Sequence, residues 1–301
     1  MRTSTAGAPA IRTEGLTKRY GPVVGLDALD LQVQRGEVFG YLGPNGAGKT
    51  TTIRLLLGML RPTAGRAEVL GIDAVADPRH AHRRLAYVAG DVALWPGLTG
   101  EETLHLLGRM HGSFDRAYRD ELVQRFELDP SRRVRAYSKG NRQKLALIGA
   151  LMTRADLLVL DEPTAGLDPL MEQVFRACVR EAAERGQTVF LSSHLLSEVE
   201  ALCAQVAILR AGRLVAAGTL ADMRWDGTLA VEASFDGERA VPDVSAVPGV
   251  LYPVVDGTVL RCRVSGPVAP LLAALAAAGA VRVVSREPTL EELFLAHYQQ
   301  Q

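Results

Sequence analysis

The chain has 301 residues, a length that suits one large domain or two smaller ones. Its 34 basic and 34 acidic side chains give a formal net charge of zero, so no overall basic field argues for nucleic acid as a partner. The longest apolar run, residues 268–281, is too short for a membrane span and is interrupted by Pro270 and Gly279. Work at a membrane would therefore require a partner that supplies the spanning part.

The cysteines and the N-terminus bear on the compartment. Cys178, Cys203 and Cys262 have no C-x-x-C spacing, and we expect them to be buried thiols in a reducing environment. No signal peptide is visible, and the polar residues 1–10 are expected to be disordered. These features favour a cytoplasmic protein.

The chain opens with predicted strands and a strand–loop–helix unit. Residues 11–16 and 29–33 read as short strands, and residues 38–42 as a buried strand. A glycine-rich loop, residues 43–50, then leads into a predicted helix over residues 50–57.

The next part is predicted to be mainly helical. Strands are expected at residues 66–70 and 85–88 before the pattern changes. Thr99 and Glu102 form a capping box that opens the first helix. Helices are predicted at residues 99–110, 115–126 and 138–152. Because this stretch interrupts an α/β pattern, we expect residues 92–152 to form an inserted helical subdomain.

Strand and helix alternate again after the helical part. The fully apolar residues 157–160 are typical of a strand in a parallel sheet that is covered on both faces. Asp168 and Pro169 supply an N-cap and a first-turn proline for a helix that ends near Gly186. Further strands are expected at residues 188–192, 206–210 and 213–217.

The sequence changes character near Leu220. We expect residues 220–301 to form a small α+β domain without a catalytic signature, for which packing or dimerisation is a more natural role than ligand binding. Thr289 and Glu292 cap a predicted last helix. The other predicted elements of this domain are strands at residues 229–234, 250–255, 258–264 and 281–285 and a helix at residues 267–278.

The loop from Gly43 to Thr50 reads Gly-Pro-Asn-Gly-Ala-Gly-Lys-Thr and fits the phosphate-binding pattern G-x-x-x-x-G-K-[ST]. Its glycines let backbone N–H groups approach phosphate oxygens, and they tolerate positive φ. Lys49 would reach the outer phosphates, and the Thr50 hydroxyl can bind Mg²⁺. The following helix turns its positively polarised N-terminus toward the anion. The sequence therefore predicts a nucleotide site.

Two acidic side chains follow the apolar strand 157–160. Asp161 would hold Mg²⁺ through water, and Glu162 would polarise the water that attacks the γ-phosphate. The alternative, a solvated acidic turn, explains neither the apolar strand before the pair nor Pro163 after it.

A second anion site is predicted at the helix that begins near Ser138. Ser138 is a natural N-cap, and Gly140 allows close backbone approach. Two anion sites in a chain with one phosphate-binding loop suggest that one of them serves a second subunit. Tyr20 is either a packed surface aromatic or a platform for a purine ring.

Together these motifs resemble those of the nucleotide-binding subunit of an ABC transporter. Residues 43–50 match the Walker A loop, and residues 161–168 match the Walker B strand end and the D-loop. Residues 137–143 resemble the family signature, and Ser192-Ser193-His194 matches the segment with the switch histidine. The motifs span roughly residues 11 to 218.

The resemblance implies an α/β P-loop NTPase core over residues 11–219, with an N-terminal antiparallel β subdomain, the helical insertion and the C-terminal α+β domain. Glu162, His194 and Lys49 would be catalytic, with Thr50 and Asp161 holding Mg²⁺. Tyr20 would stack on adenine. The residues expected to contact ATP are Tyr20, Gly43, Pro44, Asn45, Gly46, Ala47, Gly48, Lys49, Thr50, Thr51, Ser138, Gly140 and Asp168.

Two motifs depart from the family pattern. In the signature, Lys139 and Asn141 replace a glycine and a glutamine, while Ser138 and Gly140 remain, so we expect function to survive. After the strand 85–88, Gly90 stands where the family has a glutamine that binds Mg²⁺. Glycine offers no such ligand, so Asp91 or water would have to take its place.

The resemblance leads to a first hypothesis, an ATPase subunit that drives a separate membrane permease. Two copies would face each other, with each ATP between the P-loop of one copy and Ser138 and Gly140 of the other. The protein would lie on the cytoplasmic face of the membrane. Similar Y-V-x-G-D and Y-S-K-G-N runs occur in drug- and antibiotic-export ATPases of the ABC-2, daunorubicin-resistance type, which favours export.

Two other functions stay open from the sequence. One is a non-transport ATPase of the same superfamily that acts on DNA or ribosomes; the single P-loop, the lack of sustained heptads and the zero net charge argue against it. The other is a nucleotide-dependent regulator without turnover, which Gly90 favours and which Glu162 and His194 oppose.

Overall fold

The computed structural model describes residues 8–112, 114–224, 228–237 and 241–287. The chain divides into two compact units, Met1–Thr219 and Leu220–Gln301, which we describe separately. Among the described residues, no helix is both long and apolar enough to cross a membrane.

The first unit contains an N-terminal antiparallel sheet of order β2-β1-β4-β5. Its strands are β1 (Ile11–Tyr20), β2 (Val23–Val33), β4 (Ala64–Val69) and β5 (Ile72–Asp73). The hairpin of β1 and β2 is longer than the sequence predicts, because Tyr20 pairs with Val23 across a two-residue turn. Ala10, expected in the tail, is buried and donates its N–H to the Val33 carbonyl.

The central sheet confirms the predicted parallel core. Its order is β10-β9-β3-β8-β7-β6, and all pairs are parallel except that of β9 and β10. Every residue of β3, β7 and β8 is buried, as expected for strands covered on both faces. The strands are β3 (Val38–Leu42), β6 (Leu85–Val88), β7 (Leu157–Asp161), β8 (Thr188–Ser193), β9 (Gln205–Arg210) and β10 (Arg213–Thr219).

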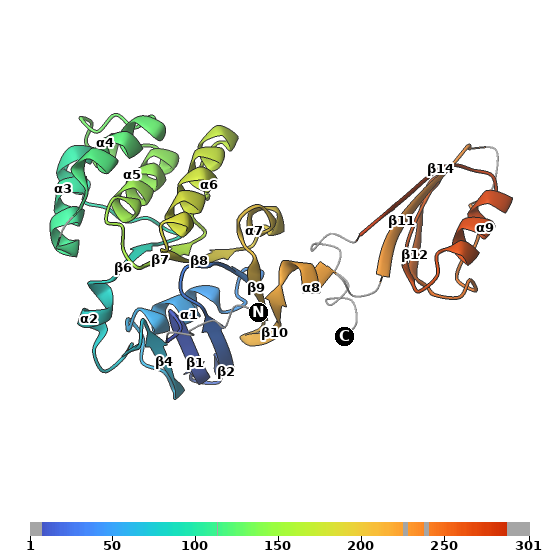
Figure 1. The fold of residues 1–301 in the computed structure, drawn as a ribbon, viewed down its shortest axis with the longest axis horizontal. Coiled ribbons are helices and arrows are strands. Elements are labelled where there is room, and N and C mark those ends of the chain that lie inside the picture. Colours follow the sequence, from blue (N-terminus) through green and yellow to red (C-terminus); the bar gives the residue numbers. More distant parts are fainter. Residues whose placement is uncertain (1–7, 113, 225–227, 238–240, 288–301) are drawn as a thin grey trace, which may run out of the picture. The chain divides into compact units, whose positions relative to one another are not determined.

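The helices of the first unit follow the capping signals. Thr99 and Glu102 form the predicted capping box, and Ser138 and Asp168 cap the helices that follow them. Figure 1 shows α3, α4 and α5 grouped together. The helices are α1 (Lys49–Leu56), α2 (Pro78–His82), α3 (Gly100–His111), α4 (Arg116–Arg125), η1 (Val134–Ala136), α5 (Lys139–Leu151), α6 (Pro169–Glu184) and α7 (Leu196–Leu202).

The core of this unit packs around the strand and helix that flank the P-loop. Tyr41 on β3 lies against Phe190 on β8, with ring centroids 5.2 Å apart. The Tyr41 hydroxyl and Thr52 on α1 share a hydrogen bond of 3.0 Å. Ile53 on α1 is fully buried in the same cluster as Leu16 and Leu29 of the N-terminal sheet. The P-loop is therefore held between two elements of the buried core.

The second unit is a four-stranded antiparallel sheet of order β12-β13-β11-β14 with a helix on one face. Leu271 and Leu275 of that helix pack against sheet residues. The predicted last helix from Thr289 lies outside the described residues. The elements are α8 (Leu220–Arg224), β11 (Thr228–Phe235), β12 (Val250–Asp256), β13 (Val259–Ser265), α9 (Ala269–Ala277) and β14 (Ala280–Arg286).

The buried thiols give a first prediction. Cys178, Cys203 and Cys262 are free and buried, as the sequence predicts. Burial raises the pKa of Cys178 to about 11 and also raises that of Cys203, so little thiolate forms at pH 8. We expect Ellman's reagent to label the native protein far more slowly than free cysteine, and to find three thiols after denaturation. Rapid labelling of any native thiol would contradict this packing.

Candidate functional site: the P-loop and the ends of the central strands

The P-loop connects β3 to α1 with its glycines in conformations that L-residues avoid. Gly46 has φ of 81° and Gly48 has φ of 109°. A Cβ on Gly48 would lie 2.6 Å from the Gly25 carbonyl oxygen, so β2 also supports the loop. This backbone leaves the N–H groups at the start of α1 without side-chain caps, as an anion site requires.

Lys49 is the buried cation of the loop, with 5% of its surface exposed. Its Nζ donates to the carbonyl oxygens of Gly43 at 2.6 Å and Pro44 at 3.2 Å. It also lies 3.4 Å from Oε1 of Glu162. The lysine is thus held by neutral acceptors and one carboxylate, which a more strongly charged anion can replace.

Asp161, at the end of β7, connects the P-loop helix to the neighbouring strand β8. The Thr50 hydroxyl donates to its Oδ2 over 3.1 Å, and the Ser192 hydroxyl donates a short hydrogen bond to its Oδ1. The side chain is 3% exposed, so these donors compensate for its burial. The structure thus brings the two predicted metal residues, Thr50 and Asp161, together.

Glu162 turns its carboxylate toward the side chains of Lys49 and His194. Its backbone has φ of 48°, a region that non-glycine residues avoid. Hydrogen bonds from its N–H to the carbonyl and the hydroxyl of Ser192 hold it there. Nδ1 of His194 lies 3.3 Å from Oε1 of Glu162, the oxygen that also faces Lys49. The three residues predicted to be catalytic therefore meet at one carboxylate.

Tyr20 is exposed at the end of β1, with 45% of its surface accessible. Its ring lies so close to Gly25 that a Cβ there would approach it to 2.8 Å. Lys18 Nζ lies 5.4 Å from the ring centroid. Because Gly25 also touches Gly48, a chain of contacts leads from this aromatic ring to the P-loop.

The N-terminus of α5 contacts the segment after Glu162. Gly140 is so close to Gly166 that a Cβ would lie 2.6 Å from the Gly166 carbonyl oxygen. The buried side chain of Gln143 donates to the Pro163 carbonyl over 2.8 Å. Asp168 caps α6 by accepting from the N–H groups of Leu170 and Met171, and these bonds lower its pKa.

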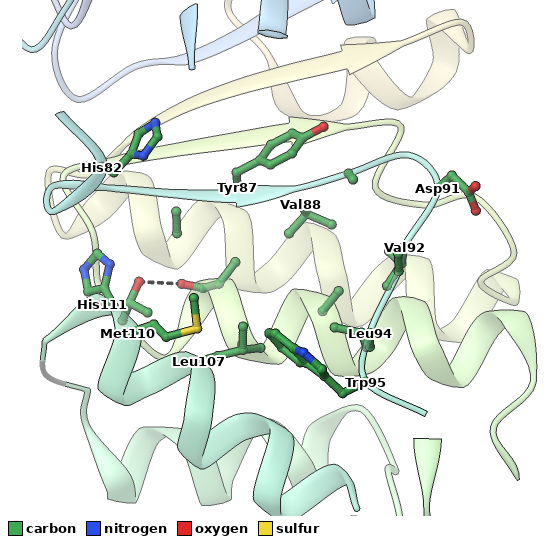
Figure 2. Close-up of a pocket in the computed structure, with 17 residues that line it drawn as sticks. His82, Tyr87, Val88, Asp91, Val92, Leu94, Trp95, Leu107, Met110 and His111 are labelled. Atoms are coloured by element: carbon green, nitrogen blue, oxygen red, sulfur yellow. Dashed lines mark hydrogen bonds between the residues drawn. The ribbon is translucent and has the colours of Figure 1, made fainter. Parts of the chain in front are cut away.

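Gly90 lies beside the end of β7, where Asp161 is located. A Cβ there would be 3.3 Å from the Asp161 carbonyl oxygen and 3.8 Å from its carboxyl carbon. A longer side chain at residue 90 would therefore start next to the Asp161 carboxylate. Asp91 is exposed at the bend that follows (Figure 2).

A mainly apolar groove of about 410 Å³ follows this bend and was not predicted from the sequence. It lies along the segment 89–95, β6, α3 and α5. Figure 2 shows Leu107, Met110 and Trp95 facing the space, with His82 and His111 at the end away from Asp91. Met110 and Trp95, which line it, are 68% and 44% exposed.

The chain is similar to known proteins along most of its length. Residues 26–165 match the family model described as "ABC transporter". The daunorubicin resistance ATP-binding protein DrrA3 of Streptomyces coeruleorubidus is 39% identical over 95% of each chain. A solved ATP-binding subunit of an ABC transporter is 32% identical, with a TM-score of 0.67 over 71% of this chain and 92% of that one. A dimeric ATP-binding cassette bound to ADP and Pi is 22% identical, with a TM-score of 0.62 over 70% of this chain and 98% of that one.

The contact between β2 and the P-loop gives a second prediction. Gly48→Ala adds a Cβ where φ is positive and the Gly25 carbonyl leaves no room. We expect the free energy of unfolding in urea to fall by about 1–3 kcal/mol and ATP affinity to drop. Gly97→Ala is the control, since nothing lies within 4 Å of its Cβ position. Equal stability and affinity of the two variants would refute the proposed packing.

Proposed function

The chain belongs to the family of ABC transporter ATP-binding proteins, and from this premise we propose that it powers export of a drug or antibiotic-like compound by a separate membrane permease. It is an ATPase subunit of a transporter. The daunorubicin-resistance relative, which matches along almost its whole length, supports the substrate class. We place the protein at the cytoplasmic face of the membrane.

The P-loop would bind the phosphates of ATP. Lys49 is already buried and oriented by the Gly43 and Pro44 carbonyls, so its positive charge is positioned before ATP arrives. The phosphates would replace these weaker acceptors and accept from the N–H groups at the start of α1. The other residues of the loop, and Thr51 after it, would contact the phosphates from the same position.

The residues beside the P-loop fit Mg²⁺. Thr50 and Asp161 offer oxygen atoms 3.1 Å apart, the ligand type that Mg²⁺ prefers. Among the described residues, no group of three or more histidine, cysteine or acidic side chains forms a metal site. That composition agrees with an ion held by few protein ligands, water and phosphate. When bound, Mg²⁺ would neutralise phosphate charge.

Glu162 and His194 would act on the attacking water. The Glu162 backbone is fixed by its bonds to Ser192, and the carboxylate can accept a proton from water or orient it. His194, 45% exposed and held against Glu162, can donate to a phosphate oxygen as charge develops there. The meeting of Lys49, Glu162 and His194 is the observation that carries this assignment.

The nucleotide would be shared between two copies. Ser138 is exposed at the N-terminus of α5, and the helix dipole there favours an anion. Gly140 lies against Gly166, and Asp168 follows two residues later as the N-cap of α6. A solved cassette of the same fold is dimeric, which supports this arrangement. Tyr20 would stack on adenine, because its exposed ring is connected to the P-loop through Gly25.

The apolar groove would receive an apolar segment of the permease. Its exposed Trp95 and Met110 give the large, adaptable apolar contacts that binding surfaces use. The segment that lines it also passes Gly90, beside Asp161. A movement of the permease segment in the groove would therefore be transmitted through residues 89–91 to Asp161 at the end of β7.

The shared site leads to a third prediction. Glu162→Gln removes the charge that activates water but keeps the shape, so ATP should bind without being hydrolysed. We expect this variant to elute as a dimer with ATP and Mg²⁺ and as a monomer without nucleotide. Glu184→Gln, an exposed change of the same kind, is the control. Failure of Glu162→Gln to form a dimer at saturating ATP would contradict the two-copy site.

The groove leads to a fourth prediction. Met110→Glu places a charge among its apolar side chains, so we expect at least about tenfold less membrane permease to co-purify with the tagged subunit from native membranes. Met59→Glu is the matched control, since Met59 is 58% exposed and lies outside the groove. Equal recovery of the permease with both variants would exclude this surface as its contact.

A further inference from the structure

A buried carboxyl group lies directly behind the loop that carries His194. Glu198 is in the first turn of α7 and is 3% exposed, a position that glutamate rarely takes without a partner. The Ser193 hydroxyl donates to its Oε2 over 2.6 Å. Its Oε1 is buried and makes no hydrogen bond among the described residues. Burial raises the pKa of Glu198, because the charged carboxylate loses its contact with water. A glutamate at this buried position therefore calls for a structural or functional explanation.

The bond from Ser193 to Glu198 shapes the backbone around His194. Ser193 ends β8, and its Oγ accepts from the Leu195 N–H over 2.9 Å while donating to Glu198. His194 lies between these two anchored residues. Glu198 therefore fixes the hydroxyl that closes the turn, and the turn holds the imidazole 3.3 Å from Glu162.

The same carboxyl group faces the segment that follows Glu162. Thr164 is 7% exposed, and its hydroxyl lowers the pKa of Glu198, as the Ser193 hydroxyl does. On α6, Glu172 raises that pKa and Arg176 lowers it. Arg176 also pairs with Glu172 over 3.4 Å, so the two charges partly balance. Glu198 is thus enclosed by the His194 loop, α6 and the segment from Glu162 to Asp168.

We propose that Glu198 is a positioning residue for ATP hydrolysis, which holds His194 against Glu162 through Ser193. It touches neither the P-loop carbonyls nor Asp161 in the contacts described above. Its effect therefore falls on the alignment for turnover and not on the capture of ATP. The inference rests on the proposed roles of His194 and Glu162.

Steady-state phosphate release separates the two effects. Glu198→Ala removes the acceptor, so we expect kcat to fall at least about tenfold while KM for ATP stays within about twofold. Glu198→Gln keeps an acceptor oxygen for Ser193, so kcat should stay within about threefold of wild type. Glu184→Gln, an exposed change, controls for the loss of one acidic charge.

A double-mutant cycle identifies the route. Ser193→Ala removes the other half of the hydrogen bond and should lower kcat to a similar extent. The double variant Ser193→Ala with Glu198→Ala should be no slower than the worse single variant. Either single change already removes the hydrogen bond between the two side chains, so the second change has nothing more to remove. Effects that multiply would overturn the route through Ser193. If Glu198→Ala does not fold, Ser193→Ala decides: unchanged kcat overturns the proposal.

The ring signals of His194 give a readout that does not need turnover. In nucleotide-free protein labelled with ¹⁵N, they should shift in Glu198→Ala and Ser193→Ala and remain in place in Glu184→Gln. Unmoved signals in both alanine variants, or wild-type kcat in Glu198→Ala, would overturn the positioning role. Absence of phosphate release from the wild-type protein would instead count against the proposed function, and the ring signals would still test the positioning.

Discussion

Hydrogen bonds from Thr50 and Ser192 to the Asp161 carboxylate hold together the three segments on which the rest of the site depends. Thr50 lies in the first turn of α1, Asp161 ends β7, and Ser192 lies on β8, which is between β3 and β7 in the sheet. A carboxylate that is 3% exposed requires such donors. The bonds fix the P-loop helix to the sheet and place the next residue, Glu162, opposite Lys49. The carbonyls of Gly43 and Pro44 orient the cation, and bonds to Ser192 hold the backbone of the candidate base.

The proposed ATP site and the apolar groove occupy different parts of the first unit but share one segment of the chain. The C-terminal ends of the parallel strands gather the residues that we assign to ATP, at the edge where open α/β sheets generally bind ligands. The helices α3 and α5 line the groove that we assign to the permease. Residues 89–91 belong to both regions, because Gly90 touches Asp161 and its neighbours line the groove. A Cβ at residue 90 would lie 3.3 Å from the Asp161 carbonyl oxygen, so the two backbones approach closely there.

The sequence predicted those helices and strands that carry one strong local signal, such as a capping residue or a fully apolar run. The capping groups Thr99, Ser138 and Asp168 located helix starts, and the fully apolar β7 indicated a parallel sheet. It missed α7, whose N-cap Leu195 makes no side-chain cap, and the groove, which forms only when distant segments pack. The role of Ser192 was also missed, since a serine within a strand carries no signal until Asp161 lies beside it. The motifs identified Lys49, Glu162 and His194 as candidates, but only the fold shows that Lys49 and His194 both lie beside the Glu162 carboxylate.

The dependence of ATPase activity on protein concentration tests the central claim most directly. If each ATP lies between the P-loop of one copy and the α5 N-terminus of another, isolated chains cannot hydrolyse it. The rate of phosphate release per chain should then rise with protein concentration at saturating ATP and Mg²⁺, and approach a plateau once the dimer is saturated. A rate per chain that stays constant down to concentrations at which the protein is monomeric would contradict the shared site.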